Sequence, residues 1–452
     1  MISKRILIIS GEPSGDLQAS LLAANLKQLD NQIEIYAVGG EHLKKTGAQI
    51  IHDIKDLSVL GLFDVLRKLD KFKALMRFIL EEIERLKPEA IIFVDFSGFN
   101  LRLAKKINNK IKTIYYISPQ VWASRQGRVA TIKKYIQKLI VIFRFEHDFY
   151  KKFGIEAEFV GHPMLDVGRP TLEKQKALAE FGLTETAPIF ALLPGSRVSE
   201  VKKILPIMAK SASIIRETIP EAQFVVAKVA HIDAKIYEKI LAKQTGLINQ
   251  TRTGIPQHTC RGAIYGARNN TTTHDVEAPF IPPEGTRRPP CRGVIYDARN
   301  NATARTVGAR FIAPEDKQLS YCFKLIESQP YDCINVADFV LVASGTATLE
   351  TAIMAKPNVI IYKMGLLNYM LYRPMIKVPY IGMENIVAGK MLAPEFIQFK
   401  AKPKVIASTV LNIFMNKERL DELQKDFREL KERLGPPNAP LRAAESILSF
   451  LK

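Results

Sequence analysis

Two turns in this chain combine glycine with polar side chains, and each follows a continuous apolar run. Residues 5–9 (RILII) lead into residues 11–16 (GEPSGD), and residues 189–193 (IFALL) lead into residues 194–197 (PGSR). Continuous apolar runs of this length are typical of buried parallel strands. Glycine lets backbone amides approach a ligand, and a following helix directs its positive end at the same point. Each turn is therefore predicted to bind a phosphate or another anion.

Three carboxylates are candidate general bases. Asp95 ends the apolar run 90–94, and a side chain at the carboxyl end of a parallel strand faces the crevice where α/β sheets bind ligands. Desolvation there would raise the pKa of Asp95 toward that of a usable base, although this residue is also suited to cap the next helix. Glu12 and Asp16 flank the first glycine turn and compete for the same role.

A third turn, at residues 343–350 (ASGTATLE), also follows an apolar run and opens a helix. Ser344, Gly345 and Thr346 leave amides and hydroxyls free to hold a pyrophosphate. Glu350, one turn into the helix, is placed to accept hydrogen bonds from ribose hydroxyls. Plain capping of the helix by Ser344 or Thr346 is the alternative.

Arg197, in the turn at residues 194–197, offers a guanidinium that can contact a phosphate through two hydrogen bonds. An ordinary surface arginine is the alternative. Together with the turn at 343–350, Arg197 predicts a site for a nucleotide diphosphate in the second half of the chain.

Two α/β domains are needed to position these turns. Apolar runs and helical segments alternate through residues 1–165, which predicts a parallel sheet covered by helices on both faces. The pattern repeats in residues 166–435 after a hinge rich in proline, glycine and charge. A last helix within residues 436–452 is expected to cross back to the first domain. The expected fold class is α/β, with two Rossmann-like domains that face one cleft.

Residues 251–316 do not follow this alternation. The sequence CRGAIY at 260–265 recurs as CRGVIY at 291–296, a repeat of 31 residues, and the segment contains no lysine. Two copies are too few to build a solenoid core. We expect a flexible surface insertion in the second domain that resembles a translated repetitive element, with a lineage-specific binding module as the alternative.

The composition is that of a globular protein, with a net charge of +19 over 452 residues. Such a charge favours an anionic membrane, an anionic substrate or a nucleic acid as partner, unless it only solubilises the surface. No aromatic and basic RNA-binding motif is visible, so nucleic acid is not expected.

No apolar run approaches the roughly 20 residues that span a bilayer, and the N-terminus lacks a secretory leader, so the expected compartment is the cytoplasm. Four scattered cysteines predict neither a disulfide framework nor a zinc site.

Residues 62–86 repeat apolar side chains at a helical period, with lysines and arginines between them. A helix of this kind suits an anionic membrane surface. The alternative is a helix that faces the core and exposes a basic side to solvent.

Taken in order, these motifs resemble the lipid-A-disaccharide synthases, a GT-B glycosyltransferase family of outer-membrane biogenesis. The segments that carry the likeness are GEPSGD at 11–16, LSVLG at 57–61, VD at 94–95 with FN at 99–100, SPQVWA at 118–123, RQ at 125–126 with Arg128, GHPM at 161–164, LPGSR at 193–197, ASGTATLE at 343–350, and EN at 384–385 with AG at 388–389. The likeness covers essentially the whole chain except residues 251–316.

The resemblance implies an inverting transferase that joins UDP-2,3-diacylglucosamine to 2,3-diacylglucosamine 1-phosphate (lipid X). The products would be a β-1,6-linked disaccharide 1-phosphate and UDP. Asp95 matches the base proposed for the family. The residues expected to bind the substrates and UDP are Gly15, Arg197, Ser344, Gly345, Thr346, Glu350 and Asn385. Because no DxD motif is present, the charge of the leaving group would fall to Arg197 and helix amides, with no cofactor and no obligatory metal.

Both implied substrates are acylated, so a peripheral enzyme on the anionic cytoplasmic face of the inner membrane is expected. A homodimer is left open. One departure from the family is Gly98, where some relatives carry a second acidic residue. The rival predictions are another GT-B-like UDP-sugar enzyme, such as a lipid-linked N-acetylglucosaminyltransferase or a UDP-sugar 2-epimerase, and a non-enzymatic nucleotide-binding protein.

Overall fold

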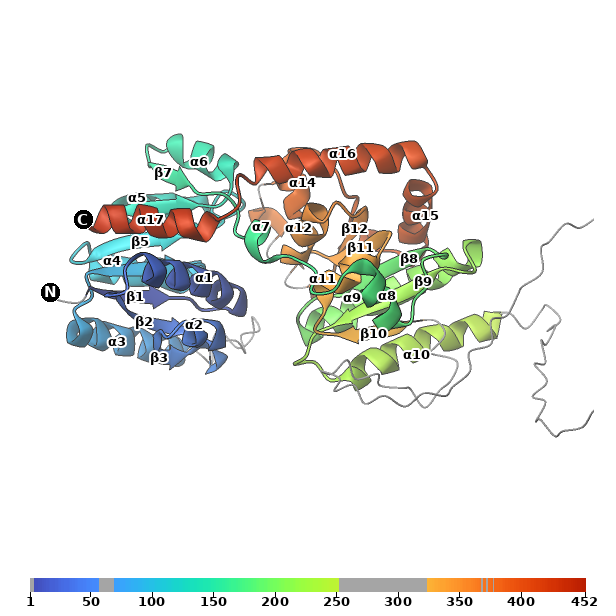
Figure 1. The fold of residues 1–452 in the computed structure, drawn as a ribbon, viewed down its shortest axis with the longest axis horizontal. Coiled ribbons are helices and arrows are strands. Elements are labelled where there is room, and N and C mark those ends of the chain that lie inside the picture. Colours follow the sequence, from blue (N-terminus) through green and yellow to red (C-terminus); the bar gives the residue numbers. More distant parts are fainter. Residues whose placement is uncertain (1–3, 57–68, 252–322, 367–368, 371–372, 377) are drawn as a thin grey trace, which may run out of the picture.

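Residues 4–56, 69–251, 323–366, 369–370, 373–376 and 378–452 are described by a computed structural model of the chain. They form two α/β halves that lie side by side, each built on one parallel sheet (Figure 1). The predicted insertion at 251–316 lies outside these residues apart from Thr251, and so does the segment 57–61. The predicted domain limits at 165 and 435 stay predictions.

The first sheet has seven parallel strands in the order β3-β2-β1-β4-β5-β6-β7. Its strands are β1 (Arg5–Ile9), β2 (Glu34–Gly39), β3 (Gln49–Asp53), β4 (Ala90–Val94), β5 (Lys112–Tyr116), β6 (Lys138–Val141) and β7 (Ala157–Phe159). The strand β4 is buried along its whole length, as its uninterrupted apolar sequence predicts. The strand order reverses between β1 and β4. Ligands bind at such a switch point, beyond the carboxyl ends of the strands.

Helices cover both faces of this sheet (Figure 1). They are α1 (Pro13–Leu29), α2 (Glu41–Lys45), α3 (Leu69–Leu86), α4 (Ser97–Ile107), α5 (Val129–Tyr135) and α6 (Arg144–Lys151), with the 3-10 turns η1 (Ile54–Asp56) and η3 (Gln126–Arg128). In α3, Leu75, Ile79 and Ile83 pack into the core. Of the two predictions for this helix, the core-facing one therefore holds for residues 69–86.

The second sheet has six parallel strands in the order β10-β9-β8-β11-β12-β13. Its strands are β8 (Ile189–Leu193), β9 (Gln223–Lys228), β10 (Lys324–Glu327), β11 (Phe339–Ala343), β12 (Asn358–Tyr362) and β13 (Glu395–Ile397). The order reverses between β8 and β11. The turns predicted to bind a nucleotide diphosphate follow these two strands, so they lie at the switch point of the second sheet.

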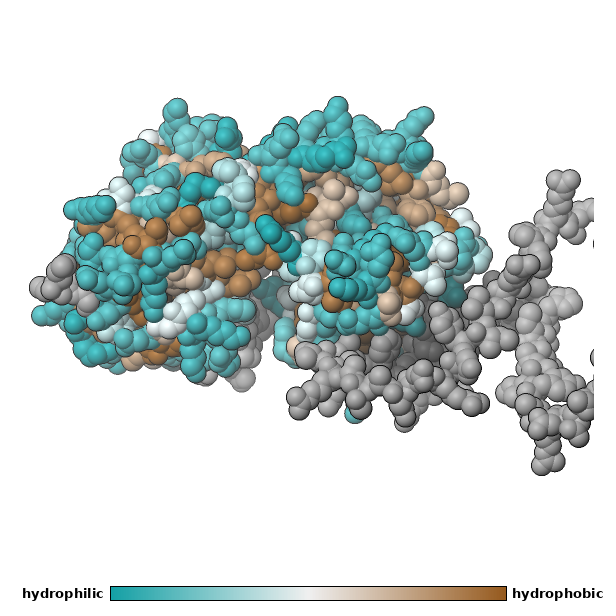
Figure 2. Space-filling view, viewed as in Figure 1, coloured by the Kyte–Doolittle hydropathy of each residue, from teal (hydrophilic) through white to brown (hydrophobic). Residues whose placement is uncertain are grey.

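The helices of the second half and the connections between the halves complete the fold. They are α7 (Met164–Val167), α8 (Lys174–Phe181), α9 (Val198–Thr218), α10 (Ala234–Thr251), α11 (Pro330–Val336), α12 (Thr346–Ile353), the 3-10 turn η4 (Arg373–Met375), α14 (Met383–Ala388), the 3-10 turn η5 (Gln398–Lys400), α15 (Pro403–Phe414), α16 (Lys417–Arg433) and α17 (Ala439–Leu451). Much of the face seen in Figure 2 is hydrophilic, including the surface of α16. The charged residues of this helix lie outside the core, which receives Leu423, Phe427 and Leu430.

The last helix, α17, lies against the first half although the chain reaches it from the second (Figure 1). Its residues Ala443, Ala444 and Ile447 share one core with apolar residues of α1 and β1. This packing joins the two halves at a second point besides the connection through α7.

The chain passes between the two halves twice, at residues 161–162 and at residues 434–435, and these two connections are in contact. The amide of His162 donates to the carbonyl oxygen of Leu434 at 2.9 Å. Gly161 and Gly435 both have positive φ, and a Cβ on Gly435 would come within 3.0 Å of the Cα of Gly161. Only glycine fits this close approach, so the two connections are held together by backbone contacts.

The expected architecture of two parallel α/β sheets is confirmed. The strands β3, β10 and β13, which lack a continuous apolar run, are all edge strands. Their short sequences mix polar and apolar residues because one side of an edge strand stays unpaired. A purely apolar run, which marks the central strands, is therefore missing.

Candidate active site between the two sheets

Asp95 directly follows β4, at the switch point of the first sheet. Asp95 and Phe96 have φ of 49° and 46°, a left-handed conformation that is strained for residues other than glycine. The carbonyl oxygen of Asp95 accepts hydrogen bonds from Tyr115 Oη at 2.5 Å and from Asn100 Nδ2 at 2.8 Å. These two buried side chains fix the strained turn that carries the carboxyl group.

The carboxyl group of Asp95 has a pKa suited to proton transfer. Burial raises its pKa to about 6, the nearby charge of Glu12 acts in the same direction, and a hydrogen bond from the backbone of Phe96 opposes them. A base whose pKa lies near the working pH is ionised and still accepts a proton readily. Asp95 thus has the position and the pKa expected of a general base.

The first glycine turn lies beside Asp95. A Cβ on Gly15 would meet the Cβ of Asp95 at 3.6 Å, and a Cβ on Gly11 would run into the ring of Phe96 at 2.2 Å. Glu12 is the N-cap residue of α1, but its side chain makes no capping hydrogen bond and is half exposed. The carboxylate of Glu12 therefore lies accessible at the edge of the turn, on the side that faces Arg197.

Asp16 has a structural position. Its Oδ1 accepts a hydrogen bond from the amide of Gly40 at 2.6 Å, and its Oδ2 accepts one from the amide of His42 at 3.0 Å. Both oxygens of this buried carboxylate thus bind amides at the N-terminus of α2, which would otherwise lack partners. We correct the candidate role of Asp16 as a base to one of capping α2.

Arg197 is the N-cap residue of α9, at the switch point of the second sheet. Its Nη1 donates to Glu200 Oε1 at 3.1 Å, while Glu200 Oε2 accepts from the amide of Ser196 at 3.1 Å. The Nη2 of Arg197 lies 4.0 Å from Glu12 Oε2 in the first half. The two glycine turns predicted from separate parts of the sequence therefore meet between the two halves.

The turn between β11 and α12 lies at the same switch point as Arg197. A Cβ on Gly345 would meet no atom of the described residues within 4 Å, so the turn is open to them on that side. Among the same residues no side chain caps α12, and the one hydrogen bond of Ser344 Oγ is a 3.4 Å bond to the carbonyl oxygen of Ile381. Gly345 and Thr346 are exposed. The capping alternative is thus not what the structure shows, and the start of the helix is accessible.

Glu350 lies one turn into α12. It shares a hydrogen bond with the hydroxyl of Tyr331, and burial raises the pKa of its carboxyl group. The same burial raises the pKa of Tyr331. Glu350 is therefore engaged within the protein, although it lies on the helix that starts at the open turn.

Asn385 does not line the space between the halves. It is fully buried, its Oδ1 accepts from the amides of Leu392 and Ala393, and its Nδ2 donates to Glu395 Oε1 at 2.9 Å. Every strong hydrogen-bonding direction of the side chain is used to fix the loop before β13. The predicted contact of the Asn385 side chain with the substrate is therefore corrected to a structural role.

His162, in the segment that joins the halves, is also structural. Burial lowers its pKa to about 3, so the ring is neutral, and its Nδ1 accepts a hydrogen bond from the amide of Met164 at 3.2 Å.

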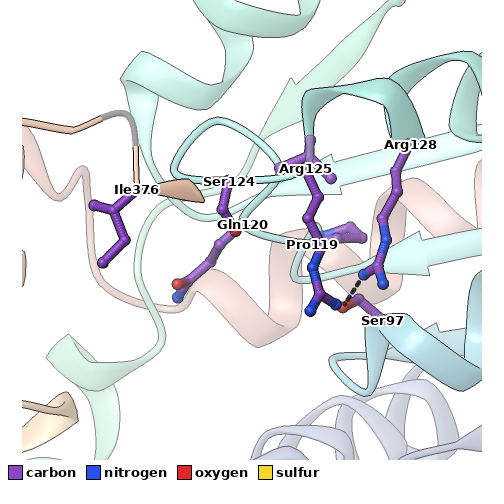
Figure 3. A pocket seen from close by; sticks show the side chains of 8 residues that line it. Ser97, Pro119, Gln120, Ser124, Arg125, Arg128 and Ile376 are labelled. Atoms are coloured by element: carbon purple, nitrogen blue, oxygen red, sulfur yellow. Dashed lines mark hydrogen bonds between the residues drawn. The ribbon is translucent and has the colours of Figure 1, made fainter. Parts of the chain in front are cut away.

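A pocket of about 190 Å³ includes Ser97, two residues after Asp95, in its lining (Figure 3). Its lining residues are Ser97, Pro119, Gln120, Val121, Ser124, Arg125, Arg128 and Ile376. All come from the first half except Ile376. The arginines belong to a segment that the sequence marked only as part of a motif, because nothing in the sequence indicates that residues 97, 125 and 128 converge.

In the described part of the chain, no helix is long and apolar enough to cross a membrane. None of the His, Cys, Asp and Glu residues in this part gather in threes in a way that suits a metal ion.

Solved structures share this fold at low sequence identity. The UDP-GlcNAc 2-epimerase of Neisseria meningitidis, bound to UDP-GlcNAc, matches with a TM-score of 0.53 and 11% identity over 99% of each chain. The MurG protein of Acinetobacter baumannii matches with a TM-score of 0.50 and 12% identity over 99% of each chain. At these identities the likeness shows the GT-B fold alone.

Sequence comparison is more specific. A family model described as lipid-A-disaccharide synthetase matches residues 6–260 and 308–445, and the gap between them falls within the predicted insertion. The lipid-A-disaccharide synthase of Syntrophus aciditrophicus (strain SB) is 34% identical over 100% of this chain and 99% of that protein. Lipid-A-disaccharide synthase 1 of Legionella pneumophila (strain Lens) is 31% identical over 99% and 98%. With its two sheets, its open turns and these matches along nearly its whole length, the chain belongs to the lipid-A-disaccharide synthase family, glycosyltransferases of lipid A biosynthesis.

Proposed function

We propose that this chain transfers 2,3-diacylglucosamine from its UDP conjugate to the 6-hydroxyl of lipid X, with inversion at the anomeric carbon and release of UDP. The observation that carries the proposal is the meeting of the two switch points, where Arg197 Nη2 lies 4.0 Å from Glu12 Oε2. Asp95 lies near Glu12, whose charge raises the pKa of the Asp95 carboxyl group. A base on the first sheet thereby faces a diphosphate-binding turn on the second.

Asp95 is the general base in this proposal. With a pKa of about 6, its carboxyl group is mostly ionised at pH 7. It takes the proton of the acceptor 6-hydroxyl as that oxygen attacks the anomeric carbon. The negative charge of Glu12 favours this proton uptake, because two carboxylates close together resist being ionised at once. Proton transfer by a positioned side chain typically contributes about 10² to 10⁴-fold in rate.

Arg197 and the start of α12 hold the UDP. Negative charge builds on the β-phosphate as the bond to the anomeric carbon breaks, and preorganised donors at that point lower the barrier. Arg197 supplies a guanidinium, and the turn at Ser344, Gly345 and Thr346 supplies amides and hydroxyls at the positive end of a helix. Glu350 accepts hydrogen bonds from the ribose once its bond with Tyr331 is exchanged. Gly15 keeps the first turn close enough to Asp95 for the acceptor to approach.

The two rivals that share the fold are separated by their substrates. A lipid-linked N-acetylglucosaminyltransferase or a 2-epimerase turns over plain UDP-N-acetylglucosamine, whereas the proposed enzyme requires the diacylated donor. The test is incubation with UDP-2,3-diacylglucosamine and lipid X in detergent micelles, followed by chromatography of the product. Disaccharide from the diacylated donor, and no reaction with plain UDP-N-acetylglucosamine, is expected. Turnover of the plain sugar nucleotide alone would overturn the proposal.

We also propose that the enzyme works at the cytoplasmic face of the inner membrane. Both substrates carry acyl chains, and a net charge of +19 favours an anionic surface. Sedimentation with vesicles should then increase with their anionic lipid content and fall as salt is added. Vesicle binding that depends neither on anionic lipid content nor on salt would contradict the proposed membrane location. The homodimer stays a prediction, which analytical ultracentrifugation measures directly.

A further inference from the structure

We propose that Arg125 and Arg128, together with Ser97, bind the phosphate group of the acceptor sugar and so orient its 6-hydroxyl toward Asp95. This inference rests on the proposed function and adds a recognition site for the phosphate monoester. It also predicts that the enzyme selects its acceptor by this group.

The shape of the pocket supports a small anionic group as its occupant. Figure 3 shows the side chains of Arg125 and Arg128 converging on Ser97, and Arg128 Nη1 donates to Ser97 Oγ at 3.2 Å. The pocket volume of about 190 Å³ is less than the roughly 300 Å³ of a typical site that buries a drug-sized molecule. It therefore suits one substituent of a substrate better than a whole glycolipid. Exposed Gln120 adds an amide at the rim.

The charge of the pocket is uncompensated. Within the described residues neither guanidinium forms an ion pair with a carboxylate, and the bond from Arg128 to Ser97 is the one side-chain hydrogen bond between them and the protein. Burial lowers the pKa of Arg128, and the neighbouring charges of Arg125 and Arg102 lower it further. Two guanidiniums held together without an acid are the arrangement that recognises phosphate through paired hydrogen bonds.

Hydrogen bonds to Glu146 and Tyr150 hold the segment that carries the arginines in place. Glu146 Oε1 accepts hydrogen bonds from Ser118 Oγ at 2.8 Å and from Trp122 Nε1 at 3.0 Å. Tyr150 Oη donates to the carbonyl oxygen of Pro119 at 3.2 Å. Arg125 itself has φ of 57°, a left-handed conformation that costs energy for a non-glycine residue. A rigid loop that holds a strained arginine over an open pocket is typical of a binding site.

The position of the pocket distinguishes the acceptor from the donor. Ser97 follows Asp95 by two residues in the first half of the chain. The charges of both Asp95 and Arg128 affect the pKa of Tyr115, so both lie near this side chain. In a glucosamine 1-phosphate, C1 and C5 flank the ring oxygen, so the phosphate lies one sugar width from the 6-hydroxyl. The donor turn, by contrast, belongs to the second sheet. A phosphate bound at Arg125 and Arg128 therefore belongs to the molecule that Asp95 deprotonates.

The test compares two acceptors, lipid X and 2,3-diacylglucosamine without its phosphate, in the same micelles. The variants are the double substitution R125A/R128A and the milder R128K. We expect R125A/R128A to lower kcat/KM for lipid X by about 10- to 100-fold, since hydrogen bonds to charged groups are worth roughly that factor. Turnover of the acceptor without phosphate, the KM of the donor and the affinity for UDP should stay unchanged. R128K should lie between the wild type and the double variant.

The control is R102A, which removes an exposed charge from α4 near Arg128 without touching the pocket. It should keep the preference for lipid X, whereas a general electrostatic effect would reduce this preference as well. Equal losses with both acceptors, an increase in the donor KM, or an unchanged preference for lipid X in R125A/R128A would each overturn the inference. If the preference changed only with the anionic lipid content of vesicles, the site would belong to a membrane headgroup. A wild-type enzyme that makes no product from either acceptor would instead refute the proposed function.

Discussion

The two sheets of this protein have the same topology around their switch points but carry different chemistry there. At its switch point the first sheet ends in a carboxylate on strained backbone, with Asp95 and Phe96 both in the left-handed region. At its switch point, the second ends in an open turn of glycine and hydroxyl residues before α12 and in Arg197. Strain is retained where a side chain must be held in one direction, as for a base. Backbone amides suffice where a diphosphate must be held.

The largest effect is expected from Asp95→Asn. The amide keeps the shape of the side chain but cannot take the proton, so kcat should fall by about 10² to 10⁴-fold. Product chromatography under saturating substrates measures the loss. Asp148→Asn, on the exposed surface of α6, should leave kcat unchanged. A variant at residue 95 that keeps more than half of the wild-type rate would remove Asp95 as the base.

The next effect in size concerns the second sheet. In the proposed mechanism Arg197 binds the diphosphate of the donor, so Arg197→Ala should raise the KM for the donor by about 10- to 100-fold. The KM for lipid X should change little, because Arg197 belongs to the donor side. Lys203→Ala, an exposed residue of the same helix, is the matched control. A larger change in the acceptor KM than in the donor KM would contradict the assignment of donor binding to the second sheet.

A stability difference of intermediate size should come from Glu384, a buried carboxyl group in α14. Burial raises its pKa to about 7, and the nearby charge of Glu395 acts in the same direction. Because the folded pKa lies above the unfolded one, the stability that Glu384 contributes is complete below about pH 4.5 and is lost as the pH rises through 7. Glu384→Gln should therefore become more stable than the wild type by on the order of 3 kcal/mol at pH 8.

Urea unfolding at pH 5 and pH 8 measures this difference. Glu84→Gln, exposed on α3, should follow the wild type at both pH values. If Glu384→Gln is no more stable than the wild type at pH 8, the carboxyl group has a partner that compensates its charge.

The smallest effect is a shift in a pH profile. The ratio kcat/KM should fall below about pH 6 as Asp95 becomes protonated. Glu12→Gln removes a charge that raises this pKa, so the acidic limb should move to lower pH by less than about one unit. Complete loss of activity in Glu12→Gln would instead identify Glu12 as the base.

The sequence predicted the central parts of both sheets and of the site because these parts have local signatures. The runs at β4, β8 and β11 are wholly apolar, and each is followed by polar residues at the switch point. Edge strands such as β10 carry no such signature, since their pairing is decided by their neighbours. Asp16 and Asn385 were assigned to the site because their types fit, but their partners lie 24 and 8 residues away.

The pocket lined by Arg125 and Arg128 also could not be predicted from the sequence, because its residues come from distant parts of the chain. Ser97 and Arg128 form a hydrogen bond across 31 residues, and Ile376 comes from the other half of the chain. Spacing along the sequence contains no information about such a convergence. The Glu146 network that positions the loop is likewise invisible until β6 and α6 are placed together.

The central claim is that the first sheet supplies the base and the second holds UDP. Calorimetric titration of UDP into Asp95→Asn and Arg197→Ala tests it most directly. We predict that Asp95→Asn binds UDP within about twofold of the wild type, while Arg197→Ala binds it at least about tenfold more weakly. Weak UDP binding in Asp95→Asn together with wild-type affinity in Arg197→Ala would place the diphosphate on the first sheet and contradict the account.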